Sequence, residues 1–139
     1  MRDSTDICSG WRGVQVARLP SPIVEVDRDT VRPGEALAIE VRIPGPIAFR
    51  DLRVTLGCDT QGGRRAHKPV RQRVFNEASG EVASNDRYTH RATVHIPADA
   101  RPSERAVDSL TTWKIEVRLK GAGGGSMAEE FPIRVASAR

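Results

Sequence analysis

Aromatic residues are scarce in this chain of 139 residues, which has two Trp, one Tyr and three Phe. Proteins that bind single-stranded nucleic acid usually stack the bases on aromatic side chains, and six scattered aromatic residues do not form such a platform. Apolar runs are also short, and none approaches the roughly 18 residues that a membrane-spanning helix requires. The composition therefore argues against nucleic acid as a partner and against insertion into a membrane.

Cysteine is almost absent as well. Cys8 and Cys58 are the only two, and neither lies in a CxxC or another metal-ligand spacing. We expect two free thiols. Cys58 shares the strand parity of Leu52, Val54 and Leu56, which predicts a small buried side chain and not a reactive nucleophile. Residues 1–20 lack the continuous apolar stretch of a secretory signal, so we expect a cytoplasmic protein.

Histidine offers the only starting point for catalysis, and the chain has three, at positions 67, 90 and 95. His90 and His95 lie on one expected strand with opposite parity, so their side chains project to opposite faces and cannot hold one metal ion together. His90 is interpreted as a residue at the rim of the core. Without a nucleophile and base at a workable spacing, we expect no catalytic residue, no metal and no cofactor, and therefore no enzyme.

Two further segments resemble ligand sites only weakly. Asp27, Asp29 and Glu35 border one turn and would permit a weak calcium site, although a solvent-exposed role at strand ends is the simpler interpretation. The glycine-rich segment 121–126 lacks the lysine of a phosphate-binding loop and joins two expected strands. We interpret it as a hairpin loop.

Alternation of apolar and polar residues is the main positive signal. Residues 113–120 and 127–135 alternate with the period of two that a half-buried strand shows, and they flank the hairpin loop. Trp113 belongs to the apolar face of the first strand and is predicted to anchor the core. That face consists of Trp113, Ile115, Val117 and Leu119.

Five more strands are expected before this hairpin. Residues 22–43 predict two strands joined by a turn at Pro33 and Gly34, with Leu37, Ile39, Val41 and Ile43 facing inward. Residues 51–60, 68–78 and 87–97 each predict one strand, and the charged strand 68–78 suits a sheet edge. Residues 77–86 are expected to be a polar connection, and 98–109 a crossover with at most a single helical turn.

The pattern predicts an all-β fold, an immunoglobulin-like or arrestin-like antiparallel β-sandwich of about seven strands. A single sandwich domain is expected over residues 21–139, after an irregular leader at 1–20. Trp11 and Cys8 lie in this leader, and their roles stay open.

The net charge of +4 comes from 19 Arg and 3 Lys interleaved with 18 acidic residues, which mainly indicates solvated strand faces. One stretch, "GGRRAHKPVRQR", is basic without an acid in it. A solvated loop and strand is the simplest interpretation, but it is also the candidate interaction surface. Its basic residues are Arg64, Arg65, Lys68, Arg71 and Arg73.

The segments "RPGEALAIEVRI", "DLRVTLGCDT", "HIPADARPSE" and "TTWKIEVRLKG…EEFPIRV" resemble, in order and spacing, the arrestin-like sandwich domains. They are most similar to the soluble C-terminal domains of a group of bacterial membrane proteins of unknown function. The resemblance covers about residues 22–136 and implies a non-catalytic module for protein–protein contact or scaffolding. The chain lacks the membrane helices of those proteins, and it has one sandwich where arrestins have two, so no binding residue is carried over.

Two functions remain after these exclusions. The first is a protein–protein interaction or scaffolding module whose partner is another protein, and edge-strand oligomerisation is compatible with it. The second is a ligand-binding sandwich that recognises an acidic or phosphate-bearing molecule through the same basic loop and strand. Fold alone does not decide between them.

Overall fold

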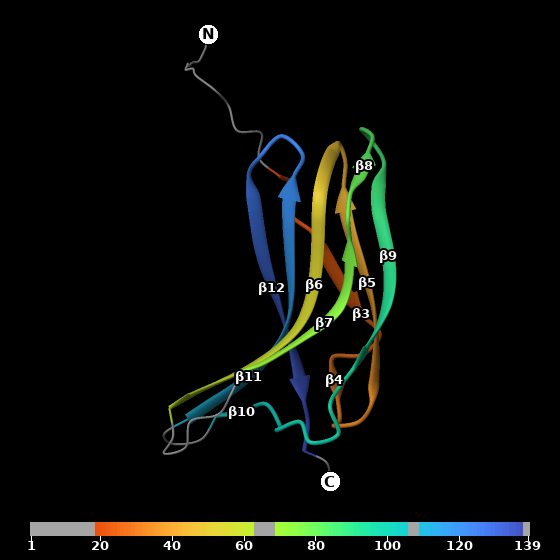
Figure 1. The fold of residues 1–139 in the computed structure, drawn as a ribbon. Helices are drawn as coiled ribbons and strands as arrows, with labels where there is room; N and C mark the ends of the chain where they lie inside the picture. Colours follow the sequence, from red (N-terminus) through yellow and green to blue (C-terminus); the bar gives the residue numbers. More distant parts are fainter. Residues whose placement is uncertain (1–18, 63–68, 106–108, 138–139) are drawn as a thin grey trace.

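The computed structural model describes residues 19–62, 69–105 and 109–137, and their regular secondary structure is entirely β (Figure 1). No helix in this described part of the chain is long and apolar enough to cross a membrane. The strands are β3 (Ile23–Val26), β4 (Thr30–Val31), β5 (Ala36–Pro44), β6 (Ile47–Gly62), β7 (Val70–Glu77), β8 (Gly80–Val82), β9 (Arg87–His95), β10 (Glu104–Arg105), β11 (Ser109–Gly121) and β12 (Ser126–Val135).

Two sheets face one another, as Figure 1 shows. The larger sheet has the order β4-β12-β11-β6-β7, with β8 attached to β6 and β10 attached to β11, while the smaller sheet has the order β3-β5-β9. All long neighbouring strands pair in antiparallel fashion. The predicted antiparallel β-sandwich is confirmed, and the strands of four or more residues among those described are the seven expected ones.

The core lies between the sheets and follows the alternation in the sequence. Trp113 is 2% exposed, and the other apolar residues of its face are fully buried. Leu52, Val54 and Leu56 of β6 lie beside them, because β6 and β11 pair along almost their whole length. The smaller sheet contributes Leu37, Ile39, Val41, Ile43 and Val94, and Ile96 follows directly after β9.

The connection between β3 and β5 differs from the expected simple hairpin. β3 does pair with β5, and Pro33 and Gly34 form the predicted turn, in which Gly34 has φ +83°. Between them, however, β4 leaves the smaller sheet and pairs in parallel with Arg134–Val135 of β12. Val31 of β4 is buried in the core there. The segment that contains Val31 therefore does not extend a hairpin with β5, but joins the larger sheet.

Two short strands lie where connections were expected. β6 begins at Ile47, four residues earlier than predicted, and β8 pairs with this extension inside the segment 77–86. Gly80 is required there, because a Cβ atom at this position would lie 2.4 Å from the Phe49 ring. β10 pairs with Leu110–Thr111 of β11, so a two-residue strand replaces the helical turn that 98–109 allowed.

β7 ends the larger sheet, as the charged sequence of 68–78 predicted. Its register shifts at Val74, because Val54 pairs with Phe75 while Thr55 pairs with Arg73. The bulge reverses the parity of the strand partway along its length. Gln72, before the bulge, has the inward parity of its partner Leu56 and lies at the rim of the core. Its side chain donates a hydrogen bond of 2.9 Å to the carbonyl of His95 on β9.

Candidate interaction surface

Four charged side chains form a chain of ion pairs across the outer face of the larger sheet. Arg71 of β7 lies 2.9 Å from a carboxylate oxygen of Asp59 on β6. Lys114 of β11 lies 3.4 Å from Asp59 and 2.6 Å from Glu130 on β12. The arrangement follows from the register, since Gly57 pairs with both Arg71 and Lys114 and has no side chain to separate them.

This chain of ion pairs shifts the ionisation of its members. Partial burial opposes the charge of Asp59, but Arg71 and Lys114 outweigh it and hold the pKa of this carboxyl below its ordinary value. The hydrogen bond to Glu130 raises the pKa of Lys114, against the opposite effect of burial. Arg71 is therefore largely committed to its own sheet, which the basic stretch of sequence did not indicate.

Arg73 is the other described member of the predicted surface. It is exposed on β7 and, among the described residues, has no ion-pair partner. Arg64, Arg65 and Lys68 lie outside the described residues. In the sequence, these three residues fall between Gly62, the last residue of β6, and Val70, the first residue of β7.

A second basic group occupies the opposite end of the same face. Arg53 of β6 stands directly opposite Arg118 of β11, and Lys120 lies two residues further along β11. Like charges directly opposite each other on a sheet are unfavourable. Asp51 and Glu116 offset the two arginines at 3.3 Å each. Lys120 stands opposite Asp51 but forms no ion pair among the described residues.

This second group borders a hollow of about 330 Å³. The hollow exists because β12 carries the small residues Ser126 and Ala128 beside Lys120 and Arg118. Its lining has three cationic side chains and one carboxylate, that of Asp51. An acidic group from another molecule would be electrostatically favoured here.

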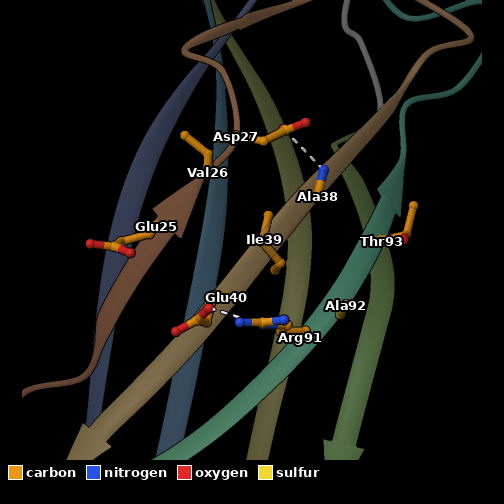
Figure 2. Close-up of a pocket in the computed structure, with 9 residues that line it drawn as sticks. All are labelled: Glu25, Val26, Asp27, Ala38, Ile39, Glu40, Arg91, Ala92 and Thr93. Atoms are coloured by element: carbon orange, nitrogen blue, oxygen red, sulfur yellow. Dashed lines mark hydrogen bonds and ion pairs between the residues drawn. The ribbon is translucent and has the colours of Figure 1, made fainter.

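Another hollow, of about 400 Å³, lies on the outer face of the smaller sheet, and Figure 2 shows its lining. Arg91 and Glu40 point toward each other across β9 and β5 and pair at 3.2 Å (Figure 2). Asp27 accepts a hydrogen bond of 3.1 Å from the Ala38 N–H. The charged groups of this hollow are thus satisfied within the chain.

The groups that might carry chemistry make contacts within the fold where the structure describes them. Cys58 is a buried free thiol, as predicted, and burial raises its pKa. His90 stacks on Phe75 with ring centroids 3.9 Å apart, at the rim of the core. Glu35 accepts a hydrogen bond of 2.8 Å from the Arg32 N–H, closing the turn. Within the described ranges, no group of three or more His, Cys, Asp or Glu could hold a metal ion.

The second basic group was not identified from the sequence. Arg53 and Arg118 are 65 positions apart, and each has an acid two residues away, so each alone is typical of a solvated strand. The outward parity of both residues was readable. Only the pairing of β6 with β11 brings them together.

No protein-family model matches the chain, and no curated protein matches its sequence. Among solved structures, the chain is similar to Spo0M, a sporulation control protein from Bacillus subtilis, with a TM-score of 0.63 at 15% sequence identity. The similarity covers 86% of this chain and 50% of that one, so the chain spans about half the length of the structure that it matches. At this identity the similarity shows the fold, an arrestin-like β-sandwich.

Proposed function

We propose that this chain is a non-catalytic protein-interaction module that contacts an acidic partner protein with the outer face of the larger sheet. The observation that carries the proposal is the charge of this face, which no other described part of the chain covers. Basic residues outnumber acidic ones on it. The basic residues are Arg53, Arg71, Arg73, Lys114, Arg118, Lys120 and Arg134, and the acidic ones are Asp51, Asp59, Glu116 and Glu130.

A protein suits this face better than a small molecule does. Four long strands present side chains in one broad layer, and the hollow on the face is open to solvent. Small ligands are usually held in concave sites that enclose most of their surface, whereas protein interfaces extend over many residues. The chain shares its fold with a sporulation control protein, and this shared fold is consistent with a regulatory role without catalysis.

The β7 end of the face is the contact that we propose. Arg73 is exposed there without a charged partner in the described chain, and the connection between β6 and β7 adds Arg64, Arg65 and Lys68. Arg71 also lies in this contact, but its charge is largely neutralised by the hydrogen bond to Asp59. Electrostatic complementarity of this kind mainly sets specificity and the association rate.

The test is affinity capture from a lysate of the native host. The variant Arg65→Glu/Arg73→Glu is compared with Arg32→Glu/Arg87→Glu, which makes the same change of charge at exposed positions away from the proposed contact. We expect one identified acidic protein to be retained by the wild type and the control, and lost with the first variant. Thermal melting by circular dichroism verifies that both variants fold.

Binding is then measured with the purified partner at low and high salt. Equal loss of binding in both variants would contradict the proposed contact, because only net charge would then matter. If no protein binds while a small polyanion does so with steep salt dependence, recognition of an acidic or phosphate-bearing molecule is the better account.

A further inference from the structure

We propose that this chain forms a symmetric homodimer in which β12 pairs in antiparallel register with β12 of a second copy. The two-fold axis passes beside Ala128. Glu130 of each copy then enters the Lys120 end of the hollow on the other. The proposal goes beyond the proposed function, because it concerns the edge of the larger sheet opposite to β7 and a different partner.

The outer edge of β12 is open in the described structure. Both the N–H and the C=O of Val135 bond to Ser103, on the side where β10 and β11 lie. Odd-numbered residues of β12 therefore turn their backbone toward β11, and even-numbered residues turn theirs toward the opposite edge. Consistent with this, the Ala136 N–H bonds to Val31, which lies on that opposite edge.

Among the described residues, only the short strand β4 pairs with the edge of β12 that faces away from β11. β4 pairs with Arg134 and Val135 alone. Ser126, Ala128 and Glu130 thus present their N–H and C=O groups along an edge that can accept another strand. Pro132 has no N–H to donate and bounds this stretch at one end, and the turn before Ser126 bounds it at the other.

Among the two-fold symmetric registers, the one centred on Ala128 pairs the whole stretch Ser126–Glu130 within these bounds. An antiparallel pair centred on Ala128 places Ala128 opposite its own counterpart and Ser126 opposite Glu130 of the other copy. The even-numbered residues then form the hydrogen-bonded pairs, with up to about six backbone hydrogen bonds across the edge. On the inner side, Met127 faces Glu129 of the second copy, so no two acids are directly opposed.

The charges of the outer face fit the same register. Ser126 pairs with Lys120 on β11, so Glu130 of the second copy, standing opposite Ser126, has only this small side chain between itself and Lys120. Lys120 forms no ion pair in the described chain, since Asp51, which stands opposite it on β6, pairs with Arg53 instead. The hollow beside Lys120 is lined by three cationic side chains and by the carboxylate of Asp51, so its net charge is positive. The symmetric contact repeats on the other copy. Each copy therefore supplies the acid, Glu130 of β12, which also pairs with its own Lys114, and the cation, Lys120 of β11, that the other copy contacts.

The dimer would join two larger sheets into one continuous sheet. Its interface consists of one strand edge and two charge contacts, so it lies at the small end of specific interfaces and is expected to be weak. Its formation therefore depends on the protein concentration.

Sedimentation velocity of the full chain tests the proposal, from about 1 µM to about 500 µM protein. We expect the mass to rise from 15.2 kDa toward twice that value with concentration. Lys120→Glu should weaken the dimer about tenfold at each of the two contacts, or about a hundredfold in total. Arg87→Glu, an equal change of charge on the smaller sheet, should leave the dimer unchanged.

The reciprocal variant makes the test specific. Glu130→Lys alone should also prevent dimerisation, and combining it with Lys120→Glu should restore the dimer, because the charges are exchanged across the axis. Circular dichroism verifies folding, since Glu130 also pairs with Lys114. A wild type that stays monomeric at all concentrations, or a double variant that fails to recover, would overturn the proposal.

A crosslink gives a readout that does not depend on these charges. Ala128→Cys, in a Cys8→Ser background, places two cysteines opposite each other across the axis, at a Cα separation of about 5.5 Å that suits a disulfide. Oxidised glutathione should convert this variant to a covalent dimer much faster than it converts Ala38→Cys, an exposed position on the smaller sheet. Equal rates for the two variants would contradict the register.

Discussion

Replacing Trp113 with alanine should remove most of the stability of the sandwich. The side chain is 2% exposed, and its indole N–H donates a hydrogen bond of 2.6 Å to the carbonyl of Arg101. Truncation of a buried tryptophan costs about 3–5 kcal/mol. The unpaired carbonyl of Arg101 adds about 1 kcal/mol. The sum, about 4–6 kcal/mol, approaches the whole stability of many domains of this size.

A graded series separates packing from hydrogen bonding. Trp113→Phe keeps an aromatic ring in the core but loses the N–H, so we expect a smaller cost of about 1–3 kcal/mol. Ile23→Ala serves as the control, because Ile23 is apolar but 50% exposed and should cost under about 1 kcal/mol.

Urea unfolding followed by far-ultraviolet circular dichroism measures all three free energies of unfolding, since this signal comes mainly from the backbone and does not require a tryptophan. We expect the loss of stability to be largest for Trp113→Ala, smaller for Trp113→Phe and smallest for Ile23→Ala. If Trp113→Ala cost no more than Ile23→Ala, Trp113 would not anchor the core, and the inward parity of β11 would be wrong.

Three further predictions follow from single sites. The pKa of Asp59 is lowered in the folded chain, so its ion pairs stabilise the fold fully above the ordinary value of 3.8 and this stabilisation is lost as the pH falls through the folded pKa. By urea unfolding, Asp59→Asn should therefore cost under about 1 kcal/mol at pH 7, and the cost should fall as the pH is lowered below 3.8. The pKa of Cys58 is raised by burial, so a thiol reagent at pH 8 should modify Cys58 slowly in the native chain and quickly in urea, which mass spectrometry of the peptide detects. Gly80→Ala should lower stability by about 1–3 kcal/mol, because the new methyl group meets the Phe49 ring, and an unchanged melting temperature would contradict that contact.

The long strands could be predicted because each repeats the period of two over enough residues. From Trp113 to Leu119 in β11 and from Leu37 to Ile43 in β5, every second residue is apolar and is buried between the sheets. The short strands could not be predicted in this way. β8 and β10 have three and two residues, too few to show a period, and each exists only because a long neighbour offers it an edge.

The candidate surface shows the limit of the same reasoning. Arg71 looked free because no acid lies near it in the sequence, yet Asp59, twelve positions earlier, reaches it across the sheet. The like-charged neighbours Arg53 and Arg118 were missed for the converse reason, because each seemed balanced within its own strand. Parity can be read from one strand, whereas register depends on the pairing of two.

Hydrogen–deuterium exchange of the full chain, with and without the captured partner, tests the proposed contact most directly. The proposed function predicts that the partner slows amide exchange in the peptides that cover Cys58–Arg73, while exchange around Ala38 and Arg91 on the smaller sheet is unchanged. Protection of the smaller sheet, with unchanged exchange at β7, would contradict the claim that the basic outer face of the larger sheet is the binding surface.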